Sequence, residues 1–169
     1  DIIKIEAPKG DPIRYLGPAR NDGMGALFLG ANRNKRSIVL DLKRTQGRAA
    51  LWRLMDGADM FVHNVRPQKI HALGFGPDDV LQRCPGIIYG GLHGYREDGP
   101  YGGRPADDDV IQSISGIAGL FKERDGEPKL VPSVIADKSA ALMASSGLIA
   151  AYVKRLRTGQ GVYMECPMF

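Results

Sequence analysis

A single aspartate, Asp137, follows an apolar run and precedes a long stretch of small, helix-forming residues. A carboxylate at such a junction has two common uses. It caps the free N–H groups of the first helical turn, and Asp is among the residues preferred there. It also serves as a nucleophile, because the N–H groups at a helix start stabilise developing negative charge. The residue pattern alone favours the cap, although the two uses are compatible.

A run of three acids, Asp107–Asp109, resembles part of a metal site. No second acidic or histidine cluster in the sequence completes an oxygen cage for a divalent cation. Acids in the first turn of a helix also complement its positive N-terminal dipole. We therefore predict a solvated helix start at this run and no metal site.

The remaining candidate groups form no motif. No shared pattern links the three histidines, which we interpret as structural or surface residues: His63, His71 and His93. The cysteines, Cys84 and Cys166, have neither CxxC nor Cys/His metal spacing, so we expect buried or turn thiols in a reducing cytoplasm. No GxGxxG or GxxxxGK[ST] phosphate loop is present.

The composition is that of an ordinary globular domain. The 169 residues suffice for one core, and they are 43% hydrophobic and 25% charged. The net charge of +4 suits an anionic ligand, but the 7% of aromatic residues are not interleaved with basic ones, so we expect no nucleic acid partner. No apolar run reaches 18 residues, which predicts no membrane span.

Strand and helix patterns alternate along the chain. Strands are expected at Ile2–Glu6, Ser37–Leu42, Asp59–His63 and Ile87–Leu92, and the final run VYMECPMF is also strand-like. Helices are expected at Thr45–Gly57, Pro67–Leu73, Pro77–Arg83, Asp107–Leu120 and about Lys138–Arg157, with a loop over Ala7–Gly23 and a hairpin-like turn over Lys122–Lys129. This order predicts an α/β fold, with a Rossmann-like parallel sheet flanked by helices. Ligands of such sheets gather at the carboxyl ends of the strands, where Asn64 and His93 would lie.

Three blocks of sequence, taken together, are more specific than this fold class. They are the NKRS of Asn34–Ser37 before the strand IVLDLK, the segment ADMFVHNVRP, and the segment Gly94–Gly116 with its GPY and DDDVIQ motifs. In this order, followed by Asp137, the blocks resemble the class III CoA-transferase family, which includes formyl-CoA transferase, carnitine–CoA transferase and acyl-CoA racemases. The resemblance covers nearly the whole chain.

The resemblance implies an architecture. Family members have a larger, interlocked fold and form homodimers. Residues 1–169 would be a partial CoA-binding α/β large domain, lacking the N-terminal strand and helix and the C-terminal portion of the family. The resemblance leaves open whether this segment is active alone.

The resemblance also implies a reaction: transfer of coenzyme A from an acyl-CoA to a small carboxylic acid. In the family, an aspartate carboxylate attacks the thioester and forms a mixed anhydride, which the CoA thiolate converts into an aspartyl-CoA thioester. Asp137 matches this nucleophile. Coenzyme A enters as a substrate, and neither a metal nor a tightly bound cofactor is expected.

The resemblance suggests which residues bind coenzyme A. Lys35 and Arg36 match cations that meet the phosphates in the family, and such groups suit phosphate recognition. The loop Asn64, Val65 and Arg66 matches a segment that lines the CoA site. Taken by themselves, Lys35 and Arg36 are better explained as ordinary surface charges. Asn64 has the alternative of a turn residue, and Arg66 that of a solvated loop charge.

Two rival functions remain. Racemase members carry a catalytic histidine at the position that we align with Asp108, and its absence favours a transferase. Asp107 stands where many members have an aromatic residue, which leaves the shape of the acyl pocket open. The other rival is a non-catalytic CoA-binding module. The sequence does not identify the acyl donor or the acceptor acid.

Overall fold

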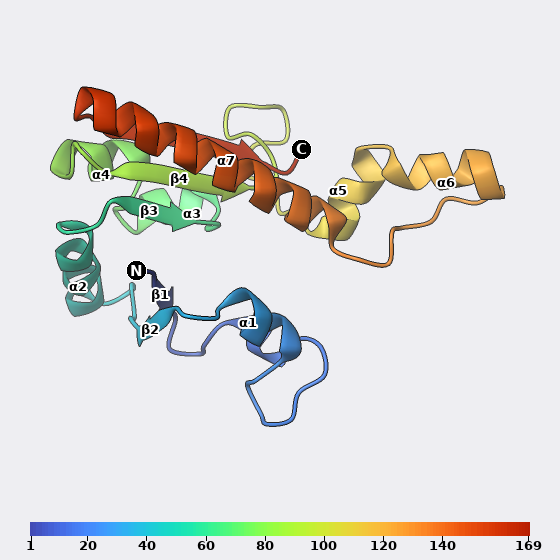
Figure 1. Ribbon diagram of the computed structural model, residues 1–169, viewed down its shortest axis with the longest axis horizontal. Coiled ribbons are helices and arrows are strands. Elements are labelled where there is room, and N and C mark those ends of the chain that lie inside the picture. The colour runs from blue at the N-terminus through green and yellow to red at the C-terminus, as the bar shows by residue number, and fades with distance from the viewer. The chain divides into compact units, whose positions relative to one another are not determined.

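The computed structural model describes all residues from 1 to 169. The chain divides into two compact units, unit 1 (Asp1–Leu54) and unit 2 (Met55–Phe169). Every strand pair in both units is parallel, so the prediction of an α/β fold with parallel pairing is confirmed (Figure 1). The strands form a two-stranded sheet in unit 1 and a three-stranded sheet in unit 2.

Unit 1 is built around a short parallel pair. Its elements are β1 (Ile3–Glu6), the 3-10 helix η1 (Pro12–Tyr15), α1 (Ala26–Ala31), β2 (Arg36–Val39) and most of α2 (Thr45–Met55). The carboxylate of Glu6 is buried, and it accepts hydrogen bonds from both Nε and Nη2 of Arg14 at 2.7 Å and from Oγ of Ser37 at 2.7 Å. This bidentate ion pair links the end of β1 to η1. The sequence did not predict η1 or α1.

Unit 2 holds the sheet that positions the candidate site. Its strands lie in the order β3 (Met60–His63), β4 (Ile88–His93) and β5 (Val162–Pro167). The crossover from β3 to β4 carries α3 (Pro67–Ala72) and α4 (Pro77–Arg83), each with proline in its first turn as expected. β4 is central and almost wholly buried, so the two glycines in it do not end the strand.

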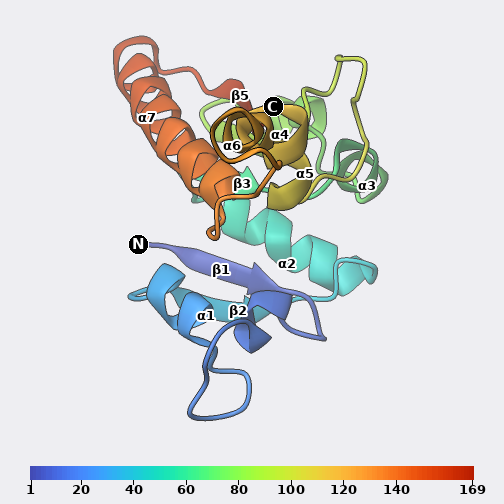
Figure 2. The same ribbon diagram turned by 90° about the vertical axis from the view of Figure 1, so that its right-hand side faces the viewer.

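The longest helix, α7 (Ile135–Thr158), lies along the three-stranded sheet in both views (Figures 1 and 2). Its small residues make this close approach possible: Ala144 and Ala151 are buried, and a Cβ on Gly147 would stand 2.6 Å from Sδ of Met164 in β5. The stripe of small residues therefore packs within the chain. No helix is both long enough and apolar enough to cross a membrane.

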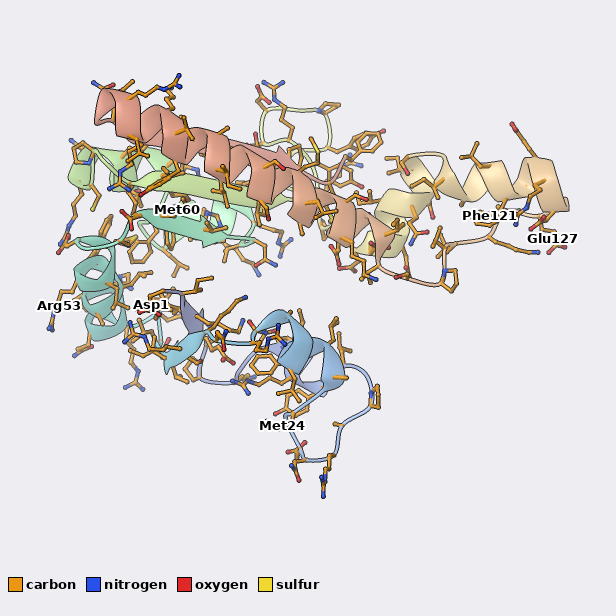
Figure 3. All side chains as sticks on the ribbon, viewed as in Figure 1. Asp1, Met24, Arg53, Met60, Phe121 and Glu127 are labelled. Atoms are coloured by element: carbon orange, nitrogen blue, oxygen red, sulfur yellow. The ribbon has the colours of Figure 1, made fainter.

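Two predictions between β4 and α7 are wrong. The single helix expected over Asp107–Leu120 is two helices, α5 (Asp108–Ile114) and α6 (Ile117–Asp125), because Gly116 adopts a left-handed φ of 86°. The hairpin expected over Lys122–Lys129 is the end of α6, where Gly126 takes the left-handed conformation typical of a residue that ends a helix. α6 buries no residue and projects from the rest of unit 2; Phe121 and Glu127 are labelled there in Figure 3.

Candidate active site

Asp137 lies in the first turn of α7. The helix begins at Ile135, and its N-cap is Val134, whose side chain makes no capping hydrogen bond. The interpretation of Asp137 as the N-cap is therefore wrong. The chain turns before the expected helix start, because the N–H of Ile135 already donates to the carbonyl of Ser133. Asp137 is thus left to interact with the helix dipole and with solvent.

The missing cap comes from another helix. Asp108, in the first turn of α5, accepts a hydrogen bond from the backbone N–H of Asp137 through Oδ1 at 2.9 Å. An N–H in the first turn has no partner within its own helix, so Asp108 does for α7 what an N-cap residue normally does. Asp108 is only 6% exposed, and the prediction of a wholly solvated acidic run is wrong for this residue. Asp107 and Asp109 are exposed, as expected.

Gln112 extends this contact one turn along α5. Its Nε2 donates to Oδ2 of Asp108 at 2.6 Å and to the carbonyl of Ser133 at 3.0 Å. Its Oε1 accepts from the N–H of Val131 at 2.8 Å. The side chain is fully buried, so each of these bonds replaces one to water. Asp108 and Gln112 together fix the path of the chain into the turn that carries Asp137.

The acids around Asp137 raise its pKa. Partial burial has the largest effect, followed by the charge of Asp108 and then that of Asp107. Each disfavours the ionised form of the carboxyl group. A carboxylate with a raised pKa is a stronger base and nucleophile once it is ionised, which suits a reacting group.

A cavity of about 510 Å³ lies beside Asp137. Its walls come from the ends of all three strands of unit 2, from the start of α5 and from the start of α7. The lining residues are Asn64, Leu92, His93, Gly94, Ala106, Asp107, Asp108, Asp109, Val134, Asp137, Ala140, Ala141, Cys166 and Met168. The expectation that Asn64 and His93 lie at the carboxyl ends of strands is confirmed, and both line this cavity. No cluster of three or more histidine, cysteine, aspartate or glutamate side chains is arranged to hold a metal ion.

A second, smaller cavity of about 270 Å³ shares a wall with the first. It lies under the loop between β4 and α5. Two arginines line it, Arg66 from the loop after β3 and Arg104 from the loop before α5. Arg66 therefore faces a cavity, whereas Val65 lines neither one.

His63 fixes the backbone of the Asn64–Arg66 loop. Its Nδ1 accepts a hydrogen bond from the N–H of Val65 at 3.1 Å, so Nε2 carries the proton and donates to Oη of Tyr89 at 2.7 Å. Oη of Tyr89 in turn donates a hydrogen bond to the carbonyl of Phe75 at 2.8 Å. Burial and the neighbouring His93 lower the pKa of His63 to about 4, which keeps the ring neutral. The structural role predicted for His63 is confirmed.

His93 is the clearest residue that the sequence motifs missed. It ends β4, is 8% exposed and lines both cavities. Nδ1 lies 3.2 Å from Oε1 of Glu165 in β5, while Nε2 has no hydrogen-bond partner. Because the carboxylate oxygen of Glu165 is the acceptor, Nδ1 of His93 is the donor in this contact. Its position directly after a strand was the available signal.

The two basic candidates of the NKRS block lie in unit 1. Nζ of Lys35 donates to Oδ1 of Asn32 at 3.2 Å, and Arg36, at the start of β2, pairs with Asp1. Asn34, directly before them, has a left-handed φ of 65°, which forms the turn into the strand. These contacts are those of surface residues beside a turn, and both side chains keep donors that could meet a phosphate.

Comparisons with known proteins agree with this geometry. The model of the family described as CoA-transferase family III matches residues 1–169. A probable fatty acyl-CoA transferase of Mycobacterium tuberculosis is 32% identical over 172 residues, which are 100% of this chain and 43% of the relative. Succinyl-CoA:glutarate CoA-transferase of Mus musculus is 32% identical over 167 residues, 98% of this chain and 38% of the relative.

Solved structures give the same result. The crystal structure of a CAIB/BAIF family protein from Brucella suis superposes with a TM-score of 0.93 at 32% identity. The match covers 100% of this chain and 46% of that one. The chain therefore spans less than half the length of the relatives that it matches.

Proposed function

Because the chain belongs to CoA-transferase family III, we propose that the whole protein transfers coenzyme A from an acyl-CoA to a carboxylic acid, with Asp137 as the nucleophile. The observation that carries this proposal is the place of Asp137: a carboxylate with a raised pKa on the wall of a cavity at the carboxyl ends of parallel strands. Residues 1–169 would be the CoA-binding part of the large domain.

The proposed reaction proceeds through Asp137 in four steps. The carboxylate oxygen attacks the thioester carbonyl and the C–S bond breaks. CoA thiolate departs, and an acyl–aspartyl anhydride is formed. The thiolate then attacks the aspartyl carbonyl and releases the donor acid as a carboxylate. The acceptor carboxylate attacks the resulting aspartyl-CoA thioester, and thiolate leaves again. Finally the thiolate attacks the acceptor carbonyl, which frees Asp137 and the new acyl-CoA.

The surrounding residues have supporting roles in this proposal. Asp108 holds the backbone of Asp137 and is itself held by Gln112, so that the carboxylate of Asp137 meets the thioester in one orientation. The dipole of α7 favours the negative charge that develops on the attacked carbonyl. Lys35, Arg36 and the Asn64–Arg66 loop would bind coenzyme A, with His63 fixing the backbone of that loop.

We further propose that the protein acts as a cytoplasmic homodimer, as the family resemblance implies. Leu142, Ile149 and Leu156, seven residues apart on α7, are 64% to 72% exposed, which leaves an apolar stripe for other chain segments to cover. Light scattering of the full-length protein would measure this assembly, and a monomer at micromolar concentration would contradict it.

Chemical trapping tests the nucleophile. The full-length protein is incubated with an acyl-CoA and then with hydroxylamine, which converts an activated aspartyl group into a hydroxamate. Mass spectrometry should locate the hydroxamate on Asp137, and Asp137→Ala should abolish both the label and the transfer. Asp98→Asn is the control, because Asp98 is exposed, pairs with Arg96 and lines neither cavity.

Three results would count against the proposal. Transfer activity in Asp137→Ala would remove the nucleophile. Exchange of deuterium at the acyl α-carbon without CoA transfer would favour a racemase. Coenzyme A binding without either reaction would favour a non-catalytic binding module.

A further inference from the structure

We propose that Glu165 is a positioning residue, which holds the loop between β4 and α5 (residues 94–107, the β4–α5 loop) in place over the coenzyme A site. The inference rests on the proposed function: Asn64 and Arg66, from the segment assigned to coenzyme A, line the smaller cavity. It goes beyond that function because it gives a role to a residue of β5 that lines neither cavity.

The first observation is that the β4–α5 loop forms part of the wall of the smaller cavity. Gly94 and Tyr95 line this cavity from the start of the loop, and residues 103–107 line it from the end. Asn64 and Arg66 line the same cavity from the segment after β3. Coenzyme A held by that segment would therefore also lie against the β4–α5 loop.

The second observation is that the β4–α5 loop does not fix its own position. It contains no helix or strand, and four of its residues are glycines. Its backbone hydrogen bonds form local turns, such as those from Gly102 to Gly99 at 2.9 Å and from Arg104 to Tyr101 at 3.1 Å. Because glycine has more backbone freedom to lose, the ordered position of this loop depends on contacts with other elements.

The third observation is that contacts from several other elements meet at Glu97 in this loop. The backbone N–H of Glu97 donates to Oε1 of Glu165 at 2.7 Å, and the same oxygen accepts from Nδ1 of His93 at 3.2 Å. Oε1 of Glu97 lies 3.2 Å from Nε2 of His71 in α3, and Oε2 accepts from Oη of Tyr163 at 3.5 Å. Glu165 thus links the loop to β5 and to the end of β4.

Among these contacts, those of Glu165 are the best shielded from water. Its side chain is 17% exposed, whereas the side chains of His71 and Glu97 are 45% and 36% exposed. Hydrogen bonds to a shielded carboxylate are strong, while exposed ion pairs contribute little. Without Glu165 the loop should leave its place for part of the time. The affinity for coenzyme A should then fall with the fraction of molecules whose loop is in place.

The test compares two substitutions of similar size. Glu165→Gln keeps an oxygen that can accept both hydrogen bonds, whereas Glu165→Met keeps the volume and removes the acceptor. Calorimetry would give the Kd of coenzyme A for each full-length protein. Steady-state kinetics would give kcat and KM for the acyl-CoA that labels Asp137. Arg155→Gln is the control, because it removes an ion pair to Asp59, at the opposite end of β3 from the cavities.

Glu165→Met should raise the Kd of coenzyme A by about three- to thirtyfold and should raise KM with it. The kcat should change by less than about twofold, because the contacts between α5 and Asp137 remain. Glu165→Gln should stay within about twofold of wild type. Arg155→Gln should lower the free energy of unfolding and leave the Kd unchanged.

Hydrogen exchange tests the loop in the wild-type protein, so this measurement does not depend on the folding of a variant. Coenzyme A should slow the exchange of amides in residues 94–107. In the variants, the amide of Glu97 should exchange faster with Met at position 165 than with Gln.

Equal effects of Glu165→Gln and Glu165→Met would overturn the inference, and so would an unchanged Kd in Glu165→Met. An equal rise of the Kd in Arg155→Gln would attribute the effect to stability and would also overturn it. Loop exchange that coenzyme A does not alter would do the same. Coenzyme A still binds in all these cases, so the proposed function would survive. Failure of the wild type to bind coenzyme A would remove the proposed function together with the inference.

Discussion

At the scale of single residues, the most informative contact is that between Asp108 and the backbone of Asp137. The carboxylate of Asp108 caps the turn that carries Asp137. After partial burial, the negative charge of Asp108 is the next cause of the raised pKa of Asp137. Asparagine at position 108 removes the charge and keeps one oxygen that can still accept the N–H of Asp137, at the cost of the bond from Gln112.

Asp108→Asn should lower the pKa of Asp137. Activity that requires ionised Asp137 falls on the acid side of the pH profile, so the acid limb of kcat/KM for the full-length protein should move to lower pH. Asp107→Asn should move the limb in the same direction by less, because Asp107 has the smaller effect. Asp98→Asn should leave it in place, and a limb that is unchanged or moves to higher pH in Asp108→Asn would contradict this account.

At the scale of elements, the chain between β4 and α7 depends on where its helices stop. α5 must end after Ile114 so that Asp108 and Gln112 face the entry to α7 while α6 leaves in another direction. Gly116 makes this break with its φ of 86°. A residue with a Cβ is strained in that conformation, even though nothing lies within 4 Å of the position that its Cβ would take.

Gly116→Ala should therefore reduce the free energy of unfolding by about 1 kcal/mol. Gly119→Ala, three residues later inside α6, is the matched control: its Cβ also meets nothing within 4 Å, but its backbone is helical. It should raise stability by about 0.5–1 kcal/mol, because alanine favours helix over glycine. Urea unfolding of the variants measures both changes, and equal signs would argue against a backbone cause.

At the scale of the whole molecule, each unit has an ionisable group whose pKa is strongly lowered. In unit 1, hydrogen bonds from Arg14 lower the pKa of Glu6 to about 2 from a usual value of 4.5. In unit 2, burial lowers the pKa of His63 to about 4 from 6.5. In these pH ranges the folded protein binds fewer protons at each group than the unfolded chain does. The free energy of unfolding therefore decreases as the pH is lowered through each range.

The contribution of His63 should be complete above pH 6.5 and lost as the pH falls to about 4. That of Glu6 should be complete above pH 4.5 and lost as the pH falls to about 2. Urea unfolding at a series of pH values should show both declines. His63→Gln should remove the pH dependence of the first range only, and Glu6→Gln that of the second; a variant that flattens the wrong range would refute the assignment.

The success of sequence reasoning differed between elements for physical reasons. Strands and proline-initiated helices depend on periodicity and on local backbone chemistry, so their positions were predicted within one to three residues. The break at Gly116 was missed, because the apolar pattern of residues 107–120 continues through it. The start of α7 was placed too late, since Asp108 satisfies an N–H of its first turn and Gln112 holds the segment before it, from 29 and 19 residues away along the chain.

The sequence by itself determined the parallel α/β fold, the three blocks that resemble CoA-transferases and the aspartate that stands after them. These depend on residue types and on short-range order, which a single chain displays directly. Only the tertiary structure decided that Asp108 caps the turn of Asp137, and that His93 and Arg104 line cavities beside it. Such relations join residues that are far apart in the chain, and they exist only where packing brings strand ends, helix starts and loops together.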